Sequence, residues 1–367
     1  MSTSRVRVLE VLGRSAGGIA RHVAQLVGAL DDHNGLVVDV ACPPDLPLAM
    51  PKPLLPLVIP NGPRGHGAAR RSLAMIARAG GYEVIHAHGL RAGVDAGLAT
   101  LRSTPVLLTV HNLVRPDIAG RGRAWSLRWS EPLAVRLSMR TFAVSEEIAT
   151  SLRSATPRQA HKIEVLHLGI GEAPTVERDA LGVRSELGVA DDDALIVTAA
   201  RLVPQKALDV ALRAVAALPR ATLALFGEGP LRARLEEMTR ALGIAERVRF
   251  MGWRDDLADH IAAADVFCLS STWEGVPLAA QEAILLGTPV VATDVGGMGE
   301  LIEDKVSGRL VPKGDAAALA RALGDLLGAP AVARRYAERA GSDLAEKFST
   351  ARMLARLEEA YRAAARA

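Results

Sequence analysis

Short apolar runs of Val, Leu, Ile and Ala alternate with amphipathic stretches along most of the chain. A run that is apolar at nearly every position and bounded by turn residues is typical of a strand buried on both faces. The strands predicted in the first half are 6–12, 37–41, 84–87, 106–110, 140–144 and 163–166. Those predicted in the second half are 195–199, 221–226, 248–251, 266–269, 289–293 and 309–311.

Between the strands, apolar positions recur at helical spacing. The helices predicted in the first half are 18–30, 68–79, 92–101 and 126–137, and further helices separate the later strands. Repeated β-α-β order predicts parallel sheets covered by helices on both faces. Because 367 residues are too many for one core, we expect two domains. The expected fold class is therefore α/β, with two doubly wound, Rossmann-like domains that face a central cleft at the carboxyl ends of their strands.

The segment 169–174 contains two glycines and a proline and is followed by an acidic stretch, which predicts a linker. The predicted domains are therefore residues 1–170 and 171–340. The last segment, 341–367, predicts a helix that crosses back over the first domain.

The composition excludes several classes of protein. A hydrophobic content of 49% excludes a disordered chain. Cys42 and Cys268 have no paired spacing, which predicts reduced, buried thiols and excludes a disulfide framework or a zinc site. The start of the chain lacks the apolar region of a signal peptide, and no apolar run reaches the length of a membrane span. We therefore expect a cytoplasmic protein.

The net charge of +3 is unevenly distributed. Up to Gly171 the chain carries 20 Lys and Arg against 12 Asp and Glu, and the remainder carries 24 against 29. Such a basic half indicates an anionic partner surface or solvated charge, and no nucleic acid is predicted as a partner. Trp125 and Trp129 lie four residues apart among several arginines. This pattern suits peripheral contact with an anionic membrane at its inner face, and equally a packed helix with a solvated basic face.

The segment 273–282 places two carboxylates around the start of a predicted helix. Pro277 suits the first helical position, where its missing N–H costs nothing. Glu274 is then expected in the loop before the helix and Glu282 inside it. The two carboxylates do not share a helical face, so we expect them to hold different parts of one ligand.

The residues between the two glutamates begin with Gly275, Val276, Pro277 and Leu278. Free backbone N–H groups at a helix start point toward an anion. A ligand with an anionic middle and hydroxyl groups on both sides fits this layout. A nucleotide sugar is one such ligand.

Arg201 and Lys206 follow the first strand of the second half. Both are expected to reach the same crevice as the glutamates, where two fixed cations suit a diphosphate whose charge grows as a bond to it breaks. The alternative is a solvated pair at a helix start, where cations are electrostatically disfavoured. Because cations are disfavoured at a helix start, binding of a diphosphate is the favoured interpretation of this pair.

Two glycine-rich turns follow predicted strands and open helices: Gly17-Gly18 and Gly227-Glu-Gly229. Glycine lets a ligand approach the backbone closely, and a helix start attracts anions. Packing alone explains either turn equally well. No third glycine completes a dinucleotide-binding fingerprint after the first strand.

His86, His88 and His111 lie near the ends of two predicted strands. A zinc site needs a third ligand and a nearby acidic group, which the sequence does not show. His86 is interpreted as a buried structural residue and His111 as a substrate contact, with a satisfied loop histidine as the alternative. The acidic run 191–193 precedes a strand and is interpreted as linker charge. Neither a metal nor another cofactor is predicted.

Five elements follow one another in the second half: Arg201 with Lys206, Gly227 to Pro230, Glu274 to Pro277, Glu282, and Pro289 to Gly297. With these elements the chain resembles the retaining glycosyltransferases of family 4, which have the GT-B architecture. The likeness covers nearly the whole chain and is strongest over residues 201–312.

The resemblance implies roles for residues of the second domain, which would bind the nucleotide-sugar donor. Glu282 would bind the ribose hydroxyls and Glu274 the hydroxyls of the transferred sugar. Arg201 and Lys206 would stabilise the departing diphosphate. Nearby backbone amides would contact sugar or phosphate.

In the first, acceptor-side domain, Gly17 and Gly18 match the family's glycine loop. His111 matches a histidine near the anomeric carbon, and His88 falls in a less regular position. One departure is Ala207, where the family often has glycine after the lysine. It is a mild change if that residue is helical.

The expected activity is transfer of a hexosyl unit from a UDP- or GDP-linked sugar, GDP-mannose included, to a hydroxyl acceptor. As the resemblance suggests, the anomeric configuration is retained and a phosphate oxygen of the donor takes the acceptor's proton. The acceptor is interpreted as a lipid-linked or polysaccharide precursor. The alternatives are a nucleotide-sugar epimerase or hydrolase of the same architecture, and a non-catalytic nucleotide-sugar sensor.

Overall fold

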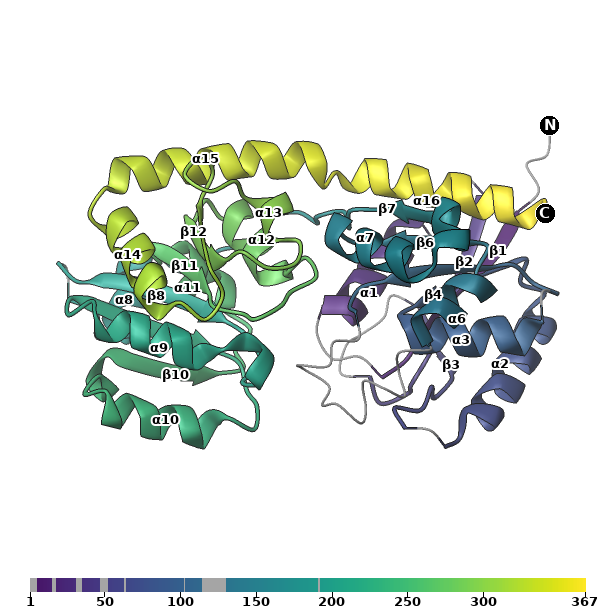
Figure 1. Cartoon of the computed structure of the whole chain (residues 1–367), viewed down its shortest axis with the longest axis horizontal. Helices are drawn as coiled ribbons and strands as arrows, with labels where there is room; N and C mark the ends of the chain where they lie inside the picture. The colour runs from purple at the N-terminus through teal and green to yellow at the C-terminus, as the bar shows by residue number, and fades with distance from the viewer. Residues whose placement is uncertain are drawn as a thin grey trace. The chain divides into compact units, whose positions relative to one another are not determined.

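The computed structural model describes residues 5–14, 18–30, 35–46, 52–62, 64–101, 103–113, 130–190 and 192–367. The chain divides into two compact units (Figure 1). Unit 1 comprises Met1–Gly171 and Phe348–Ala367, and unit 2 comprises Glu172–Lys347. Each unit contains a parallel sheet with helices on both faces, which confirms the predicted fold class of two doubly wound α/β domains.

The sheet of unit 1 has the strand order β3-β2-β1-β4-β5-β6-β7, and all its pairs are parallel. Its strands are β1 (Val6–Leu12), β2 (Leu36–Cys42), β3 (Leu55–Pro56), β4 (Val84–His88), β5 (Val106–Val110), β6 (Arg140–Ala143) and β7 (Ile163–Val165). The sequence did not predict β3, which lies in a proline-rich segment. Proline is tolerated there because β3 is an edge strand with a free side.

Successive residues of the unit 1 strands face opposite sides of the sheet. Leu107 belongs to a core cluster with α1 (Gly18–Leu30) and α16 (Thr350–Ala365). Leu108 faces α3, where a Cβ added to Gly93 would lie 2.7 Å from the leucine side chain. In the described part of the unit, the remaining helices are α2 (His66–Gly80), α3 (Leu90–Thr100), α6 (Ser130–Leu137), α7 (Glu146–Ala155) and the 3-10 turn η2 (Pro157–Lys162).

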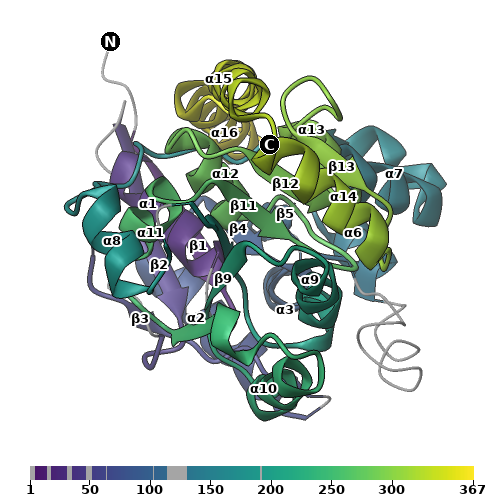
Figure 2. The ribbon, with the colours of Figure 1, turned by 90° about the vertical axis from the view of Figure 1, so that its left-hand side faces the viewer.

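Unit 2 has the strand order β10-β9-β8-β11-β12-β13. Its strands are β8 (Ala194–Ala199), β9 (Ala221–Phe226), β10 (Val248–Gly252), β11 (Val266–Leu269), β12 (Val290–Thr293) and β13 (Arg309–Val311). Figure 2 looks onto this unit, with α9 and α14 on one side of the sheet and α11 and α12 on the other. Its helices are α8 (Ala180–Glu186), η3 (Pro204–Lys206), α9 (Leu208–Ala216), α10 (Arg232–Ala241), η4 (Ala245–Arg247), α11 (Leu257–Ala262), α12 (Leu278–Leu285), α13 (Met298–Leu301), α14 (Ala316–Leu327) and α15 (Pro330–Lys347).

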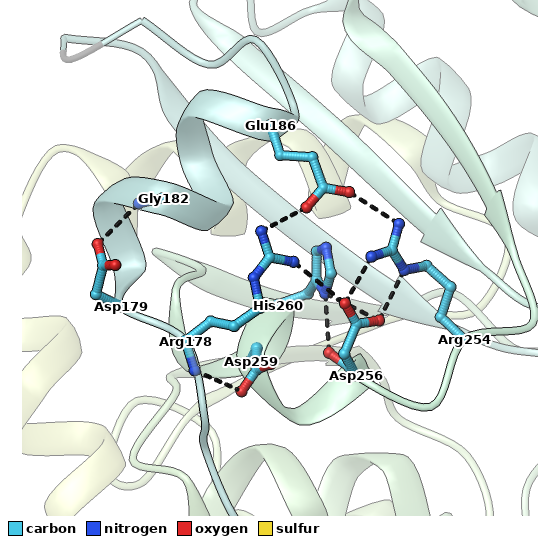
Figure 3. Close-up of polar contacts among 8 residues, drawn as sticks. All are labelled: Arg178, Asp179, Gly182, Glu186, Arg254, Asp256, Asp259 and His260. Carbon is cyan, nitrogen blue, oxygen red and sulfur yellow. Dashed lines mark hydrogen bonds and ion pairs between the residues drawn. The ribbon is translucent and has the colours of Figure 1, made fainter.

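An ion-pair network fastens the first segment of unit 2 to the rest of the unit (Figure 3). The guanidinium of Arg178 pairs with Glu186 at 2.6 Å and with Asp256 at 3.2 Å. Arg254 pairs with the same two carboxylates, at 2.8 Å and 2.6 Å. The hydrogen bonds from Arg254 lower the pKa of Asp256 to about 2, so this carboxylate stays charged in mild acid.

Both cysteines, Cys42 and Cys268, are buried free thiols, as predicted. Burial raises the pKa of Cys268 to about 12, which keeps the thiol protonated and unreactive. Among the described residues, no single helix has both the length and the apolar character of a membrane span. The helices α14 and α15 pass that test only as a pair, bent by 101°.

The two indoles predicted to face a membrane, Trp125 and Trp129, lie outside the described residues. The first four residues of the predicted helix 126–137 lie outside them as well, and the described part forms α6.

Candidate active site

The candidate site in unit 2 is built around an ion pair. Nζ of Lys206 lies 2.5 Å from Oε1 of Glu274, and Oγ of Ser271 donates a hydrogen bond to the same oxygen at 2.5 Å. Glu274 is buried, and Lys206 is half-buried. Among the described residues, Oε2 of Glu274 has no hydrogen-bond partner. The carboxylate is thus fixed through one oxygen while the other remains able to accept from a ligand hydroxyl.

Hydrogen bonds join the two loops that carry this pair. Nε2 of Gln205 donates to the carbonyl of Trp273 at 2.9 Å, and the N–H of Thr272 donates to the carbonyl of Gln205 at 2.8 Å. Oγ of Ser270 donates to the carbonyl of Lys206 at 3.0 Å. The loops follow β8 and β11, which are neighbours in the sheet. Both therefore lie at the carboxyl edge, where doubly wound domains bind ligands.

Two glycines support the Glu274 loop from the side of β12. Gly296 has a φ of +61°, and a Cβ at this position would lie 1.7 Å from the carbonyl oxygen of Glu274. The N–H of Gly297 donates to the carbonyl of Gly275 at 2.6 Å. Only glycine permits so close a backbone approach at residue 296.

The helix α12 begins at Leu278, and Pro277 is its N-cap. The sequence placed Pro277 inside the first turn, and this prediction was wrong by one residue. The ψ of Pro277 is 121°, which is extended rather than helical. Among the described residues, the N–H groups of Gly275, Val276 and Leu278 have no hydrogen-bond partner. They remain able to bind an anion at the helix start, and half-buried Glu282 follows inside the helix.

Arg201 differs from Lys206 in its surroundings. Its side chain is exposed, and no ion-pair partner for it exists among the described residues. The sequence predicted that Arg201 and Lys206 both serve a diphosphate as fixed cations; in the structure the positive charge of Lys206 is already balanced by Glu274. Of these two cations, Arg201 is therefore the one that could add uncompensated positive charge to this edge.

Gly227 and Gly229 pack against the loop that carries Arg201. A Cβ at Gly227, where φ is +119°, would lie 2.2 Å from the carbonyl oxygen of Ala200. A Cβ at Gly229 would lie 2.5 Å from the carbonyl oxygen of Leu202. The backbone contact itself requires both glycines, so packing explains them without a ligand. The turn holds Arg201 in place through this contact.

Ala207 is the residue at which the chain departs from the family pattern. Its φ is 42° and its ψ 43°, a left-handed conformation that is rare for residues other than glycine. The departure would be mild for a helical residue, but Ala207 is the left-handed N-cap of α9. Glycine would adopt this conformation without strain.

In unit 1, parallel register gathers polar side chains on one face of the sheet. Glu10 of β1 pairs with His86 of β4, and His88 pairs with Thr109 of β5. Every second residue points to the same side, so His111, two residues after Thr109, joins this group. Nε2 of His88 lies 2.7 Å from Oε2 of Glu10, and Nδ1 of His88 lies 3.2 Å from Nε2 of His111.

The last helix, α16, completes the group with Tyr361. Its hydroxyl donates to Oε1 of Glu10 at 2.8 Å, and Nδ1 of His86 lies 2.7 Å from the hydroxyl oxygen. Nε2 of His86 lies 2.8 Å from Oγ1 of Thr109. His86 is buried and satisfied on both ring nitrogens, in agreement with the predicted structural role. Glu10 was missed, although a carboxylate within an apolar strand was a visible signal.

Burial controls the charges of this group. It lowers the pKa of His22, on α1, to about 3, and it also lowers the pKa values of His88 and His111. Burial alone would raise the pKa of Glu10, but His86 and His88 beside it hold that pKa well below its ordinary range. At neutral pH the carboxylate of Glu10 is therefore charged, while His22, His88 and His111 are neutral.

A pocket of about 240 Å³ opens beside these histidines within unit 1. Its walls include His88 and His111, apolar side chains such as Ile19 and Ile59, and the arginine Arg91. A mostly apolar pocket with a few polar groups is the usual form of a small-molecule site. His111 thus lines a pocket, and its contact with a substrate stays a prediction.

The sequence showed no acidic group near the histidines, and here the prediction was wrong. Ligand atoms of Glu10, His86 and His88 lie within 4.8 Å of one another, close enough to hold a metal ion. Each of these atoms already has a hydrogen-bond partner within the group. The distances of 2.7–2.8 Å are those of hydrogen bonds between the side chains.

The glycine loop of unit 1 is described in part. Gly17 lies outside the described residues, and Gly18 is the first residue of α1. The structure thus brings Lys206 and Glu274 into contact in unit 2, and it brings His88 and His111 into contact in unit 1.

The folds of both units match known proteins. The chain is similar to the Anabaena protein Alr3699/HepE, solved in complex with UDP and glucose, with a TM-score of 0.83 and 23% identity over 98% of this chain and 100% of that one. It is similar to sucrose-phosphate synthase from Thermosynechococcus elongatus, with a TM-score of 0.84 and 23% identity over 98% of each chain. These likenesses define a GT-B fold.

Sequence comparisons then identify the family. The model of glycosyl transferases group 1 matches residues 183–343, and that of Glycosyltransferase Family 4 matches residues 16–172. The D-inositol 3-phosphate glycosyltransferase of Mycobacterium avium (strain 104) is 32% identical over 301 residues, which are 78% of this chain and 71% of that protein. The chain belongs to the group 1 glycosyltransferases of family 4.

A second relative is the lipopolysaccharide core biosynthesis glycosyltransferase LpsE of Rhizobium meliloti (strain 1021). It is 36% identical over 166 residues, which are 45% of this chain and 49% of LpsE. The D-inositol 3-phosphate glycosyltransferase of Mycobacteroides abscessus aligns over 59% of its own length. The chain thus spans about half to three fifths of the length of these two curated relatives.

Proposed function

We propose that this glycosyltransferase moves a hexosyl unit from a nucleoside diphosphate sugar to a hydroxyl acceptor, with retention at the anomeric carbon. The observation that carries the proposal is the edge of unit 2 formed by the Lys206–Glu274 pair, the free amides of Gly275 and Val276, and exposed Arg201. A carboxylate with one unoccupied oxygen suits sugar hydroxyls. Amides and a guanidinium suit a diphosphate whose charge grows during bond cleavage.

We propose a UDP-linked sugar as the donor. The Anabaena protein, similar over 98% of this chain, was solved in complexes with UDP and with UDP-glucose, which supports uridine over guanosine. In this proposal Glu282 binds the ribose, and Glu274 binds the transferred sugar. No metal ion takes part, because Arg201 and backbone amides supply the stabilisation of the leaving group.

Retention is proposed with the donor's own phosphate oxygen taking the proton of the acceptor hydroxyl on the same face. The enzyme then contributes positioning and stabilisation of the leaving group rather than a strong base. The acceptor is proposed to be a lipid-linked or polysaccharide precursor, which would bring the enzyme to the inner face of a membrane. The basic composition of residues 1–171 supports such an anionic acceptor.

A panel of UDP-, GDP-, ADP- and TDP-sugars tests the donor by thermal shift. A ligand at 100 times its Kd stabilises the folded state by about 2.7 kcal/mol, which raises the melting temperature. We expect a UDP-sugar to give the largest rise, and the Glu282→Ala variant to lose most of it. A rise with GDP-mannose alone would replace UDP by GDP, and no rise with any of them would refute the proposal.

Product analysis then tests the reaction. NMR of the product should show the anomeric configuration of the donor, and EDTA should leave the rate unchanged. Release of free sugar or of an epimer, in the presence of acceptors, would instead indicate a hydrolase or an epimerase. Binding without turnover of any donor would indicate a sensor.

A further inference from the structure

The buried hydrogen bonds around Glu10 admit one arrangement of protons. The carboxylate of Glu10 only accepts hydrogen bonds, and Nε2 of His88 lies 2.7 Å from its Oε2. The proton of the neutral His88 ring must therefore be on Nε2, and its Nδ1 carries a lone pair. Because His88 Nδ1 lies 3.2 Å from Nε2 of His111, that nitrogen of His111 must carry the second proton.

The state of the other ring nitrogen of His111 follows from this arrangement of protons. His111 is 5% exposed and lines the pocket of about 240 Å³. Its Nε2 donates to His88, so its Nδ1 is a lone-pair acceptor. Among the described residues, this nitrogen has no hydrogen-bond partner. Because His111 lines the pocket, a ligand hydroxyl there could donate to this lone pair.

Packing fixes the rings as well as the protons. The ring of His22 stands edge-on to those of His88 and His111, with centroids 5.9 Å and 5.6 Å away. On the far side of Glu10, the hydroxyl of Tyr361 donates to Oε1 and keeps the carboxylate in place. The orientation of His111 is therefore set by α1, by α16 and by three strands of the sheet.

We propose that Glu10 is a positioning residue that acts through His88 to fix the tautomer of His111, so that Nδ1 of His111 accepts a hydrogen bond from a hydroxyl group of the substrate. Glu10 does not touch the substrate. The chain of donors runs from His111 to His88 to Glu10, and it points away from the pocket. This inference rests on the proposed function only for the identity of the hydroxyl-bearing ligand.

The isosteric variant Glu10→Gln tests the relay because it reverses the chain of donors. The carboxamide oxygen can still accept from Tyr361, while its NH₂ group donates to Nε2 of His88. His88 then carries its proton on Nδ1 and donates to His111, whose proton moves to Nδ1 and faces the pocket. The hydrogen bonds that link Tyr361, residue 10, His88 and His111 are kept, but the acceptor offered to the substrate becomes a donor.

The primary measurement is the tautomeric state from ¹⁵N spectra of histidine-labelled protein. We expect Nε2–H rings for His88 and His111 in the wild type and Nδ1–H rings for both in Glu10→Gln. Nδ1–H at His111 of the wild type would overturn the proposal, even if the variant does not fold. Unchanged tautomers in a folded variant would overturn it too.

The rates of transfer and of acceptor-free hydrolysis show whether the hydroxyl group belongs to the donor sugar or to the acceptor. Leaving a buried polar group unsatisfied corresponds to roughly a 10- to 100-fold loss. A loss of this size in both transfer and acceptor-free hydrolysis would place the hydroxyl on the donor sugar. A loss in transfer alone would place it on the acceptor. Equal rates for wild type and Glu10→Gln would refute the inference.

The matched control is Thr109→Val, which removes the buried hydrogen bond to Nε2 of His86 but leaves Glu10 and His88 in contact. This variant should leave the tautomer of His111 unchanged, because Thr109 is not part of the relay. It should change the rate of transfer by no more than about twofold. If the wild type consumes no nucleotide sugar, the proposed function fails, while the spectra still decide whether the relay exists.

Discussion

The ammonium of Lys206 lies 2.5 Å from Oε1 of Glu274, so two residues that are 68 positions apart in the sequence form one half-buried ion pair. The pair joins the loop after β8 to the loop after β11, and Ser271 reinforces it from the second loop. Its consequence is that the lysine charge is already compensated before any ligand is bound.

Double-mutant analysis tests this pair. We expect Glu274→Gln to lower the free energy of unfolding by about 2 kcal/mol, because Lys206 then keeps a poorly solvated charge without its partner. Lys206→Met should have a similar effect on Glu274. The double variant should be less destabilised than the sum of the two by about 1 kcal/mol, measured by urea denaturation. Strict additivity would contradict a direct ion pair.

Arg201 is expected to act on the reaction rather than on stability, since its exposed side chain has no ion-pair partner among the described residues. Arg201→Ala should reduce kcat/KM by about 10²- to 10³-fold, the effect of removing one preorganised donor, and should leave the melting temperature unchanged. The control is Arg213→Ala, which removes an exposed arginine of α9 that pairs with Asp209. Equal activity in both variants would show that Arg201 has no role in leaving-group stabilisation.

Ala207→Gly should stabilise the protein. Alanine at a φ of 42° is strained by about 1–2 kcal/mol, whereas glycine adopts this conformation freely and loses somewhat more entropy on folding. We expect a net gain of about 0.5–1 kcal/mol, measured as a rise in the denaturation midpoint. Ala233→Gly, at an exposed helical position of α10, should instead cost about 1 kcal/mol. A loss of stability in both variants would contradict the assigned strain.

Asp256 should make the stability of unit 2 depend on pH in strong acid. Its folded pKa of about 2 lies below the ordinary value of 3.8, so its contribution is complete above pH 4 and is lost as the pH falls through 2. Asp256→Asn should cost about 1 kcal/mol at pH 7 after solvent screening, and the two stability curves should converge near pH 2. Asp192→Asn, at a highly exposed ion pair, should show no such difference.

His22 should contribute a second pH dependence in a milder range. Its folded pKa of about 3 lies below the ordinary 6.5, so between these values the unfolded chain binds a proton that the folded protein does not. Stability therefore decreases as the pH falls from 6.5 toward 3, by up to about 1.4 kcal/mol per pH unit. His22→Phe should make the slope between pH 6 and 4 shallower, whereas His161→Gln, at an exposed position, should leave it unchanged.

The chain's local pattern was sufficient for the fold class, and it also predicted the sheet edge at which the candidate site lies. Apolar runs with β-α-β order require parallel sheets, and ligands bind at the carboxyl ends of such strands. The order of Arg201, Lys206, Glu274 and Glu282 also pointed to the family, because the adjacent strands and helices set the spacing of these residues along the chain.

Contacts between distant segments depended on tertiary structure alone. Glu10 reaches His88 across 78 positions and Tyr361 across 351, because strand order and the return of the last helix bring them to one face of the sheet. No local periodicity encodes such a meeting. The left-handed backbone of Ala207 and the neutralised charge of Lys206 have the same origin, since each is imposed by a neighbouring loop rather than by the residue's own preference.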